Sequence, residues 1–482
     1  MAANQLPDKG GQDKDGQRRG YRFDNLGGGT ADNQLFVCLA FSGGGTRAAA
    51  LAYGVMVALQ QTEIEWPRRE RLLDAVDCIS SVSGGSFTAA YYGLFGDQLF
   101  SDFKQQFLYR NVPVDLLLQA GLPWNWPLLW SPYYSRIDLA AEFYDQAVFG
   151  HKTYTDLITK GKRPFIILNA TNIGNGQRFS FTQNQFDLIG SDLGPFPVAR
   201  AVAASSAFPF LLSPLTLENY QPISGFVAPT AYRKGGEGWK AYYENRSRYE
   251  WAKSQLNYVD APQPYVHLLD GGLADNIGLR AIIEEESEGF INRHLPEMKR
   301  LVIIAVNART VAPDTISSVH HTPHILPTVA MATATIAMDN YSLETVDFTN
   351  RLKTELQQAK DDSRKLGQPL RAPVPYVSEI GFEAIPNKGS RQAFLSVGTN
   401  FNLPDEQIDA LVYAGCNLVK RDPFFQCLLD NIASNGAHSE GDQACNNLSN
   451  ELHSPAAERI VCPEAGKWGP AQAAFIADGA KQ

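Results

Sequence analysis

Ser83 is the residue of this chain best placed to act as a nucleophile. It lies at the centre of Ser81-Val82-Ser83-Gly84-Gly85, between an apolar stretch and a helical pattern of small residues. A serine at a sharp strand-to-helix turn presents its hydroxyl above the sheet, and the residues two before and two after it must be small. Gly85 meets this requirement fully, and Ser81 stands where glycine is usual. A serine-rich helix cap is the structural alternative.

A carboxylate that could act as a base follows another apolar stretch. Asp270-Gly271-Gly272 comes directly after the sequence YVHLL. An acid at the carboxyl end of a strand lies on the edge of the sheet where α/β enzymes bind ligands. The alternative is a turn in which the aspartate caps the following helix. Asp275 lies further into the same turn, and we interpret it as structural.

The third candidate is a glycine-rich turn, Gly43-Gly44-Gly45-Thr46-Arg47. Its backbone N–H groups are not shielded by side chains and lie at the N-terminus of a helix, so they attract an anion. The pattern Gly43-x-Gly45-x-x-Ala48 fits a dinucleotide pyrophosphate. A tetrahedral oxyanion in acyl transfer fits equally well. A tight turn that binds nothing is the third interpretation.

The elements around these turns predict a layered α/β fold with a largely parallel sheet. Continuous apolar runs are typical of strands buried on both faces. The helical patterns directly after the first two turns cover Ala48–Gln60 and Phe87–Phe95. Alternating strands and helices imply layers of helix on a central sheet. The expected strands are Leu35–Phe41, Asp77–Val82, Phe165–Ala170, Tyr265–Leu269 and Leu301–Asn307.

Composition divides the chain into three parts. Residues 1–34 are rich in Gly, Asp and Lys and predict a disordered segment. Residues 35–310 hold the three turns and form the expected α/β domain. Residues 311–482 predict a C-terminal, mainly helical extension. Within the domain, Pro229–Tyr258 is rich in Tyr, Arg, Lys and Glu and predicts an insertion over one face.

Charge and hydrophobicity exclude some partners. The net charge of −9 argues against nucleic acid, whose phosphates require a basic face. No apolar stretch reaches the length of a membrane-spanning helix, and the N-terminus has no apolar signal core. Peripheral membrane contact stays open, because a small interfacial patch binds lipid without a basic surface.

The six cysteines fall into two groups. Cys38 and Cys78 lie in apolar runs and predict buried free thiols. The other four crowd a polar region, where disulfides and free thiols are both open. No Cys-x-x-Cys pair is present, so we expect no zinc site. The compartment stays open, with export or the cell envelope favoured over the cytoplasm. The second group is Cys416, Cys427, Cys445 and Cys462.

Taken together and in this order, the turns resemble those of the patatin-like phospholipases, and more distantly those of the cytosolic phospholipases of the same fold. That family carries a glycine loop ending in Arg or Lys, a serine elbow and a late Asp-Gly-Gly. Here these are Gly43–Arg47, Ser81–Gly85 and Asp270–Gly272. Ala203–Pro209 is similar to the small-residue stretch beside the family's active site. The resemblance covers about Leu35 to Asn307, and the combination is specific although each motif alone is not.

The resemblance implies a catalytic Ser–Asp dyad. Asp270 would accept the proton of Ser83 as the serine attacks an ester carbonyl, giving an acyl-enzyme that water then cleaves. The expected substrates are glycerophospholipids or other lipid acyl esters, with peripheral membrane contact. No metal and no cofactor is expected.

The resemblance also implies an oxyanion hole made of the N–H groups of Gly43, Gly44 and Gly45. Arg47 would fix this loop or add positive potential. The chain departs from the family pattern where Ser81 replaces the first glycine of the elbow, and at both ends of the glycine loop. None of these changes removes a predicted donor, so they leave the reaction class intact and put chain-length or headgroup preference in doubt.

Three alternatives remain. A Ser-Asp-His triad of the α/β-hydrolase type needs a histidine after Asp270. A nucleotide-binding oxidoreductase would use the glycine loop with Glu63 or Glu65, but it leaves the other two turns unexplained. A non-catalytic lipid-binding protein could have kept the fold. The histidines available for a triad are His294, His320, His321 and His324.

Aromatic residues and prolines gather in Gly121–Ser135. Indole and phenol rings settle at the headgroup level of a bilayer, so this stretch could form a lipid-facing lid or entrance. The alternative is a cap over the core, since burial is the commoner fate of tryptophan. The residues concerned are Trp124, Trp126, Trp130, Tyr133 and Tyr134.

Overall fold

The structure of the chain is a computed structural model. It describes residues 19–27, 34–122, 131, 134–209, 211–221, 227–228, 230–244, 246–282, 298–311, 373–439 and 454–464, with single positions at 338, 345, 347, 354, 358, 442 and 445.

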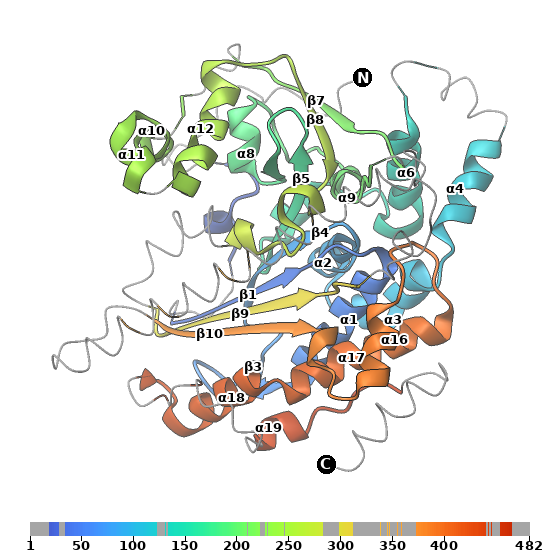
Figure 1. Cartoon of the computed structure of the whole chain (residues 1–482), viewed down its shortest axis with the longest axis vertical. Coiled ribbons are helices and arrows are strands. Elements are labelled where there is room, and N and C mark those ends of the chain that lie inside the picture. The colour runs from blue at the N-terminus through green and yellow to red at the C-terminus, as the bar shows by residue number, and fades with distance from the viewer. Residues whose placement is uncertain are drawn as a thin grey trace, which may run out of the picture.

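One mixed sheet forms the centre of the described part of the chain (Figure 1). Its eight strands have the order β10-β9-β1-β4-β5-β8-β7, with β6 paired to β5 outside this path. The strands are β1 (Leu35–Phe41), β4 (Val76–Val82), β5 (Phe165–Asn172), β6 (Gln177–Ser180), β7 (Leu215–Glu218), β8 (Tyr265–Asp270), β9 (Arg300–Asn307) and β10 (Val374–Gly381). A separate pair consists of β2 (Glu63–Ile64) and β3 (Glu70–Arg71).

The five strands from β10 to β5 run parallel, whereas β6 and β8 run antiparallel to β5. Every residue of β1, β4, β5 and β9 is buried. Strands covered on both faces consist of continuous apolar runs, and this explains why all four were visible in the sequence. The predicted fold class, a largely parallel sheet flanked by helices, is confirmed.

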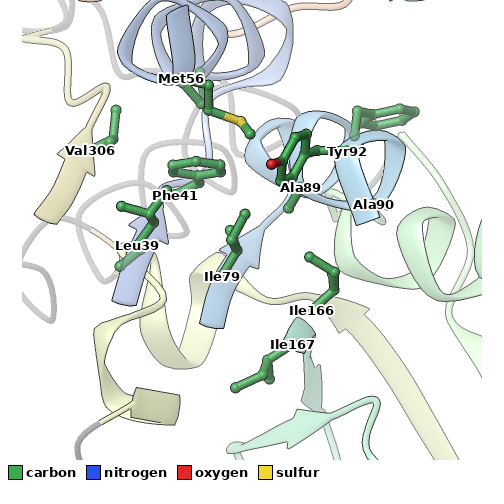
Figure 2. Packing of buried hydrophobic residues seen from close by; sticks show 14 of the residues in the cluster. Leu39, Phe41, Met56, Ile79, Ala89, Ala90, Tyr92, Ile166, Ile167 and Val306 are labelled. Carbon is green, nitrogen blue, oxygen red and sulfur yellow. The ribbon is translucent and has the colours of Figure 1, made fainter. Parts of the chain in front are cut away.

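Helices α1 (Gly45–Gln61) and α2 (Gly84–Phe95) cover one face of the parallel strands. Leu39, Ile79 and Ile166 are partners in the register of β1, β4 and β5, so their side chains lie on the same face. Figure 2 shows Met56 of α1 and the α2 residues above this face. Ile167 points to the other face, as the alternation of a strand requires.

The remaining helices surround the sheet. In the first two-thirds of the chain they are α3 (Gln98–Phe103), α4 (Val112–Gly121), α6 (Arg136–Tyr144), α7 (Tyr154–Lys160), α8 (Gln183–Leu188), α9 (Val198–Ser205), α10 (Thr230–Gly236), α11 (Gly238–Glu244), α12 (Arg246–Asp260) and α13 (Gly272–Asp275). The C-terminal ones are α16 (Lys388–Leu395), α17 (Asp405–Arg421), α18 (Pro423–Asn435) and α19 (Pro455–Glu458). No described helix is both long and apolar enough to cross a membrane.

The predicted insertion, Pro229–Tyr258, forms helices in the structure. Helices α10, α11 and α12 follow β7 and precede β8 along the chain. They stand together at one end of the molecule (Figure 1). Trp239 and Tyr243, one helical turn apart on α11, are both strongly exposed. The insertion therefore adds a separate group of helices without interrupting the sheet.

The predicted boundary near residue 310 does not separate two packing units. β10, which lies beyond it, pairs with β9 over its whole length as an edge strand of the same sheet. Helix α17 packs closely on α1, because Gly54 and Gly415 let the two backbones approach. A Cβ on Gly54 would lie 2.1 Å from the carbonyl oxygen of Val412. The described residues beyond 310 form helices α16 to α19 and also supply the edge strand β10 of the central sheet.

Polar contacts join this C-terminal part to the sheet as well. Arg300, at the start of β9, donates two hydrogen bonds of 2.7 Å to the carboxylate of Asp442. The Tyr376 hydroxyl of β10 donates to the same carboxylate at 2.7 Å. All three side chains are buried, and charge-assisted bidentate bonds of this kind fix orientation tightly.

The prediction that residues 1–34 are disordered is wrong for residues 19–27. Tyr21 and Phe23 are buried, and both rings contact Phe165 of β5. The Tyr21 hydroxyl accepts a hydrogen bond of 2.8 Å from the N–H of Ile166. Two aromatic side chains in an otherwise polar segment supply enough apolar area to hold it against the sheet.

All six cysteines form disulfides, so the prediction of free thiols at Cys38 and Cys78 is wrong, although their burial is confirmed. These two residues are register partners on β1 and β4, with Cα atoms 4.7 Å apart. The sequence showed both apolar runs but not their register. The other bridges join Cys416 to Cys462 and Cys427 to Cys445.

Candidate active site

Ser83 occupies a strained turn between β4 and α2. Its backbone has φ 50° and ψ −122°, a conformation that residues with a side chain rarely adopt. Strain of this kind persists only where the surrounding structure holds it, and it concentrates at functional sites. The turn places the hydroxyl at the N-terminus of α2, as the nucleophile-elbow pattern predicts. Ser83 as a whole is 7% exposed, so it is almost fully buried.

Asp270 lies at the same end of the sheet as Ser83, on a strand that runs in the opposite direction to β4. β5 extends beyond the end of β4, since Val82 is paired with Asn169. Of the residues of β5, only those of this extension pair with β8, and Asp270 lies opposite Ala170. The sequence placed Asp270 at the carboxyl end of a strand but did not give the direction of that strand, which is antiparallel to β5. The acid meets the elbow because β8 ends where β4 ends.

Asp270 and Ser83 lie close enough for the Ser83 hydroxyl to stabilise the Asp270 carboxylate. The N–H of Gly272 donates a hydrogen bond of 2.8 Å to Oδ1 of Asp270. Burial raises the pKa of Asp270 from its ordinary value of 3.8 to about 7, and the Gly272 N–H and the Ser83 hydroxyl oppose the rise. The carboxyl group therefore changes its charge near neutral pH.

The predicted glycine loop adopts conformations that favour glycine. Gly44 and Gly45 have φ of 138° and 60° at the start of α1. The N–H of Gly43 donates to the carbonyl of Asn276 at 2.9 Å, so it is already engaged. In the described part of the chain the N–H groups of Gly44 and Gly45 make no hydrogen bond. Of the three predicted donors, only Gly43 therefore donates to another described group.

The loop and the elbow touch through their glycines. A Cβ on Gly84 would lie 1.9 Å from the carbonyl oxygen of Gly45, and a Cβ on Gly43 would lie 3.3 Å from the Cβ of Ser83. Gly43 also faces Asn276, whose Oδ1 would be 2.5 Å from the same Cβ. The glycine loop therefore packs directly against the Ser83 turn, and side chains larger than hydrogen would separate the two turns.

Arg47 fixes the glycine loop to two other parts of the chain. The guanidinium is buried and donates to the carbonyl oxygens of Ala308 at 2.9 Å and Val397 at 2.6 Å. The neighbouring Thr46 N–H donates to the carbonyl of Asn400 at 2.9 Å. Of the two roles predicted for Arg47, these contacts favour fixing the loop.

The small-residue stretch Ala203–Pro209 lies beside both predicted catalytic residues. The Ser205 hydroxyl accepts a hydrogen bond of 3.0 Å from the N–H of Ser83, and the carbonyl of Ala207 accepts one of 3.0 Å from the N–H of Asp270. The resemblance indicated this stretch but no individual contact. Asn276, whose carbonyl accepts the N–H of Gly43, was not predicted from the sequence, because a backbone carbonyl is the same in every residue.

The structure describes only some of the residues on which the alternative functions depend. The four histidines proposed for a triad lie outside the described residues, as do Trp124, Trp126, Trp130 and Tyr133. Tyr134 is described, and its hydroxyl donates to Glu142 at 2.8 Å. The oxidoreductase acids Glu63 and Glu65 both pair with Arg69. They follow α1, whose 17 residues span roughly 25 Å, so they lie far from the glycine loop.

Comparison with solved structures finds several that are similar to this chain. Human GIVD cytosolic phospholipase A2 aligns with 13% identity and a TM-score of 0.43, covering 85% of this chain and 64% of that one. The same human protein in complex with methyl gamma-linolenyl fluorophosphonate has 14% identity and a TM-score of 0.40, and the alignment covers 85% of this chain and 60% of that one. VipD from Legionella pneumophila has 14% identity and a TM-score of 0.29, with 89% of this chain and 70% of that chain covered. This chain thus spans less than two-thirds of the length of the human protein. Among curated proteins there is no match.

A family model gives the firmer result. The model described as Patatin-like phospholipase matches residues 39–283, just over half of the 482 residues. The match begins within β1 and includes the glycine loop, the elbow and the Asp-Gly-Gly turn. It supports a lipid acyl hydrolase activity. The chain belongs to the patatin-like phospholipase family.

Proposed function

We propose that this protein hydrolyses lipid acyl esters, as a phospholipase A or lysophospholipase does, with Ser83 as nucleophile and Asp270 as base. The observation that carries the proposal is the closeness of the two residues: the Ser83 hydroxyl lowers the pKa of the Asp270 carboxyl, and Ser205 contacts the backbone of both turns. A nucleophile and a base within hydrogen-bonding reach of each other are the minimal requirement for covalent catalysis. A base whose pKa is about 7 is well matched to neutral pH.

In the first half of the reaction, Asp270 takes the proton of Ser83 while Oγ attacks the ester carbonyl carbon. The tetrahedral intermediate then collapses, and Asp270 returns the proton to the oxygen of the departing alcohol. In the second half a water molecule gives its proton to Asp270 and attacks the acyl-enzyme. The fatty acid leaves, and Ser83 recovers its proton.

The negative charge of each tetrahedral intermediate needs donors that are already in place. We infer that the open N–H groups of Gly44 and Gly45 supply them at the N-terminus of α1, with Arg47 holding the loop. Fixed donors stabilise a developing oxyanion without reorganisation, and one donor is worth about 10²–10³ in kcat. Gly43 then belongs to the scaffold of this hole, because its N–H is bound to Asn276.

Labelling with a fluorophosphonate tests the proposal, because only an activated serine reacts. Wild-type protein should be labelled at Ser83 and should hydrolyse a phospholipid or lysophospholipid from a lipid panel. Ser83→Ala and Asp270→Asn should each reduce hydrolysis to background while the protein stays folded, since the two residues act as a unit. A folded wild-type protein that is neither labelled nor active would favour the non-catalytic lipid-binding alternative.

The same assay separates the dyad from the triad. Single replacements of His294, His320, His321 and His324 by alanine should leave activity within about an order of magnitude. If one of them is as damaging as Ser83→Ala, a histidine is the base and the Ser–Asp–His alternative is correct.

We also propose peripheral contact with a lipid surface through α4. Val114, Leu117 and Leu118 are exposed on one face of this helix. The N–H of Val112, at the start of α4, donates to the carbonyl of Phe401. The Phe401 ring lies 5.7 Å from the ring of Phe87 in α2, the helix that follows Ser83, so α4 is connected to the candidate site through Phe401. An apolar helix face of this kind lowers its free energy by entering the headgroup region.

Charge introduced on that face tests the contact. The double variant Leu117→Asp/Leu118→Asp should lose most co-sedimentation with phosphatidylcholine vesicles while it hydrolyses a soluble short-chain ester normally. Trp239→Asp on α11 is the matched control, because Trp239 is equally exposed but belongs to the insertion. Equal losses in the two variants would argue against α4.

We propose, finally, that the protein functions in an oxidising compartment. Cys416, Cys427, Cys445 and Cys462 form two bridges, and such bridges are rare where thiols are kept reduced. Mass spectrometry of protein recovered from its native source without reductant should detect both. Four free thiols would instead indicate the cytoplasm.

A further inference from the structure

The strained backbone of Ser83 needs a partner that holds it. As the residue before α2, Ser83 has an N–H group that no helical carbonyl can accept. The Ser205 hydroxyl accepts this N–H at 3.0 Å. Ser205 is the last residue of α9, a helix distant in sequence from the elbow. The contact therefore connects the nucleophile to a separate element of the fold.

The Ser205 hydroxyl is itself held in one orientation. It donates to the carbonyl oxygen of Asn169 on β5 at 2.6 Å, and the side chain is fully buried. The hydroxyl of Ser86 lies 2.9 Å away on its other side. Because its proton is committed to Asn169, the oxygen of Ser205 presents its lone pairs to the N–H of Ser83.

The same short segment also holds the turn that carries the base. The carbonyl of Ser205 accepts the N–H of Gly271 at 3.1 Å, and the carbonyl of Ala207 accepts the N–H of Asp270 at 3.0 Å. One residue thus contacts the backbone on both sides of the dyad, with its side chain toward Ser83 and its carbonyl toward Gly271.

We propose that Ser205 is the positioning residue that sets the distance between Ser83 and Asp270. This inference rests on the proposed dyad. Ser205 does not touch the ester; it acts by fixing φ and ψ at Ser83 relative to the Asp-Gly-Gly turn. A displacement of about 1 Å between reacting groups can cost about 10²-fold in rate. Losing the Ser205 hydroxyl should therefore slow the chemical step more than it weakens substrate binding.

Ser205→Ala tests this, with Ser206→Ala as the matched control. Both hydroxyls are fully buried at the end of α9, but that of Ser206 donates to Val202 within its own helix at 2.8 Å. We expect kcat per folded molecule to fall about 10- to 100-fold in Ser205→Ala, with KM within about threefold. Ser206→Ala should keep kcat within about threefold while losing similar thermal stability.

Two further measurements separate positioning from a general loss of structure. Ser205→Cys keeps a weak acceptor at the same place, so its kcat should lie between those of the serine and alanine proteins. The pH at which kcat/KM is half-maximal should be unchanged in all variants, because Asp270 stays buried. Equal kcat in Ser205→Ala and Ser206→Ala, with an active wild type, would overturn the inference. An inactive wild type, or an active Ser83→Ala, would instead overturn the proposed dyad.

Discussion

Two neighbouring turns of this protein are built in the same way and serve different parts of the proposed chemistry. β1 and β4 are adjacent parallel strands, and each passes through a sharp turn into a buried helix. In the first turn Gly44 and Gly45 take positive φ values. In the second, Ser83 does so with φ 50°. The difference lies in which residue type occupies the unusual conformation.

That difference decides what each turn presents to a substrate. Glycine adopts a positive φ at no steric cost and leaves its N–H uncovered, so the first turn presents backbone donors. Serine adopts it under strain and projects a hydroxyl, so the second presents a nucleophile. The contact between Gly84 and Gly45 holds the two turns together. Substitutions at these positions should reveal how far each turn depends on the other.

The largest effect is expected for Gly84→Ala. Its Cβ would lie 1.9 Å from the carbonyl oxygen of Gly45 and 2.7 Å from the Gly45 nitrogen, and backbone atoms cannot rotate away as a flexible side chain can. Both turns must shift, so fluorophosphonate labelling and hydrolysis should fall to background. Overpacking of this kind costs about 1–3 kcal/mol of stability or more.

Gly121→Ala is the control for that variant. Gly121 ends α4, and no atom of the described residues lies within 4 Å of a Cβ built there. This protein should keep wild-type labelling and unfold at the wild-type temperature or slightly above it. If Gly84→Ala remains active, the two turns do not depend on their close contact.

A smaller effect concerns pH and involves only the second turn. Burial raises the pKa of Asp270 to about 7, and the proposed base must be ionised to take a proton from Ser83. The value of kcat/KM should therefore fall about tenfold for each pH unit below 7 and level off above it. A profile of soluble-ester hydrolysis from pH 5 to 9 measures this. A level profile down to pH 5 would exclude Asp270 as a base with this pKa.

Stability should change with pH in the opposite direction. The folded protein protonates Asp270 below about pH 7, whereas the unfolded chain does so only below its ordinary value near 3.8. Between these values the folded state binds more protons, so this group's contribution to the free energy of unfolding falls as pH rises from about 4 to 7. Asp270→Asn removes that contribution, so the variant should be more stable than wild type at pH 8 and lose this advantage near pH 4. Equal stability at both pH values would mean that the carboxylate is not destabilised by burial.

The comparison of the turns also shows what the sequence could predict. Both turns and the strands before them were visible, because a strand buried on both faces leaves a continuous apolar run and the turns need small residues. The direction of β8 was not visible, since an apolar run carries no information about which way its strand enters the sheet. β10 was missed because VPYVSEIG mixes polar residues and a proline into an edge strand.

The contacts that position the candidate site were beyond the reach of sequence patterns. The bond from Ser83 to Ser205 joins residues 122 positions apart, and that from Gly43 to Asn276 involves two backbone groups. Backbone donors and acceptors are the same in every residue, so no residue type marks them. The pairing of Cys38 with Cys78 likewise follows from the register of β1 and β4, which either apolar run alone leaves open.

The smallest effect, and the one that isolates the strain at the elbow, is the stability difference between Ser83→Gly and Ser83→Ala. Both variants lose the hydroxyl that is the proposed nucleophile, so both should be inactive. Only the alanine keeps a Cβ at φ 50°, where such strain costs about 1–3 kcal/mol. Glycine relieves this strain but gains about 0.4–1 kcal/mol of conformational freedom in the unfolded chain. The glycine variant should therefore be more stable by about 1 kcal/mol, measured as a higher midpoint of urea unfolding at an unchanged slope. The first turn should show the same preference for glycine, because Gly44→Ala places a Cβ where φ is 138° and should destabilise. Equal stability of the two Ser83 variants would mean that the elbow is not strained, and the two turns would then differ only in their side chains.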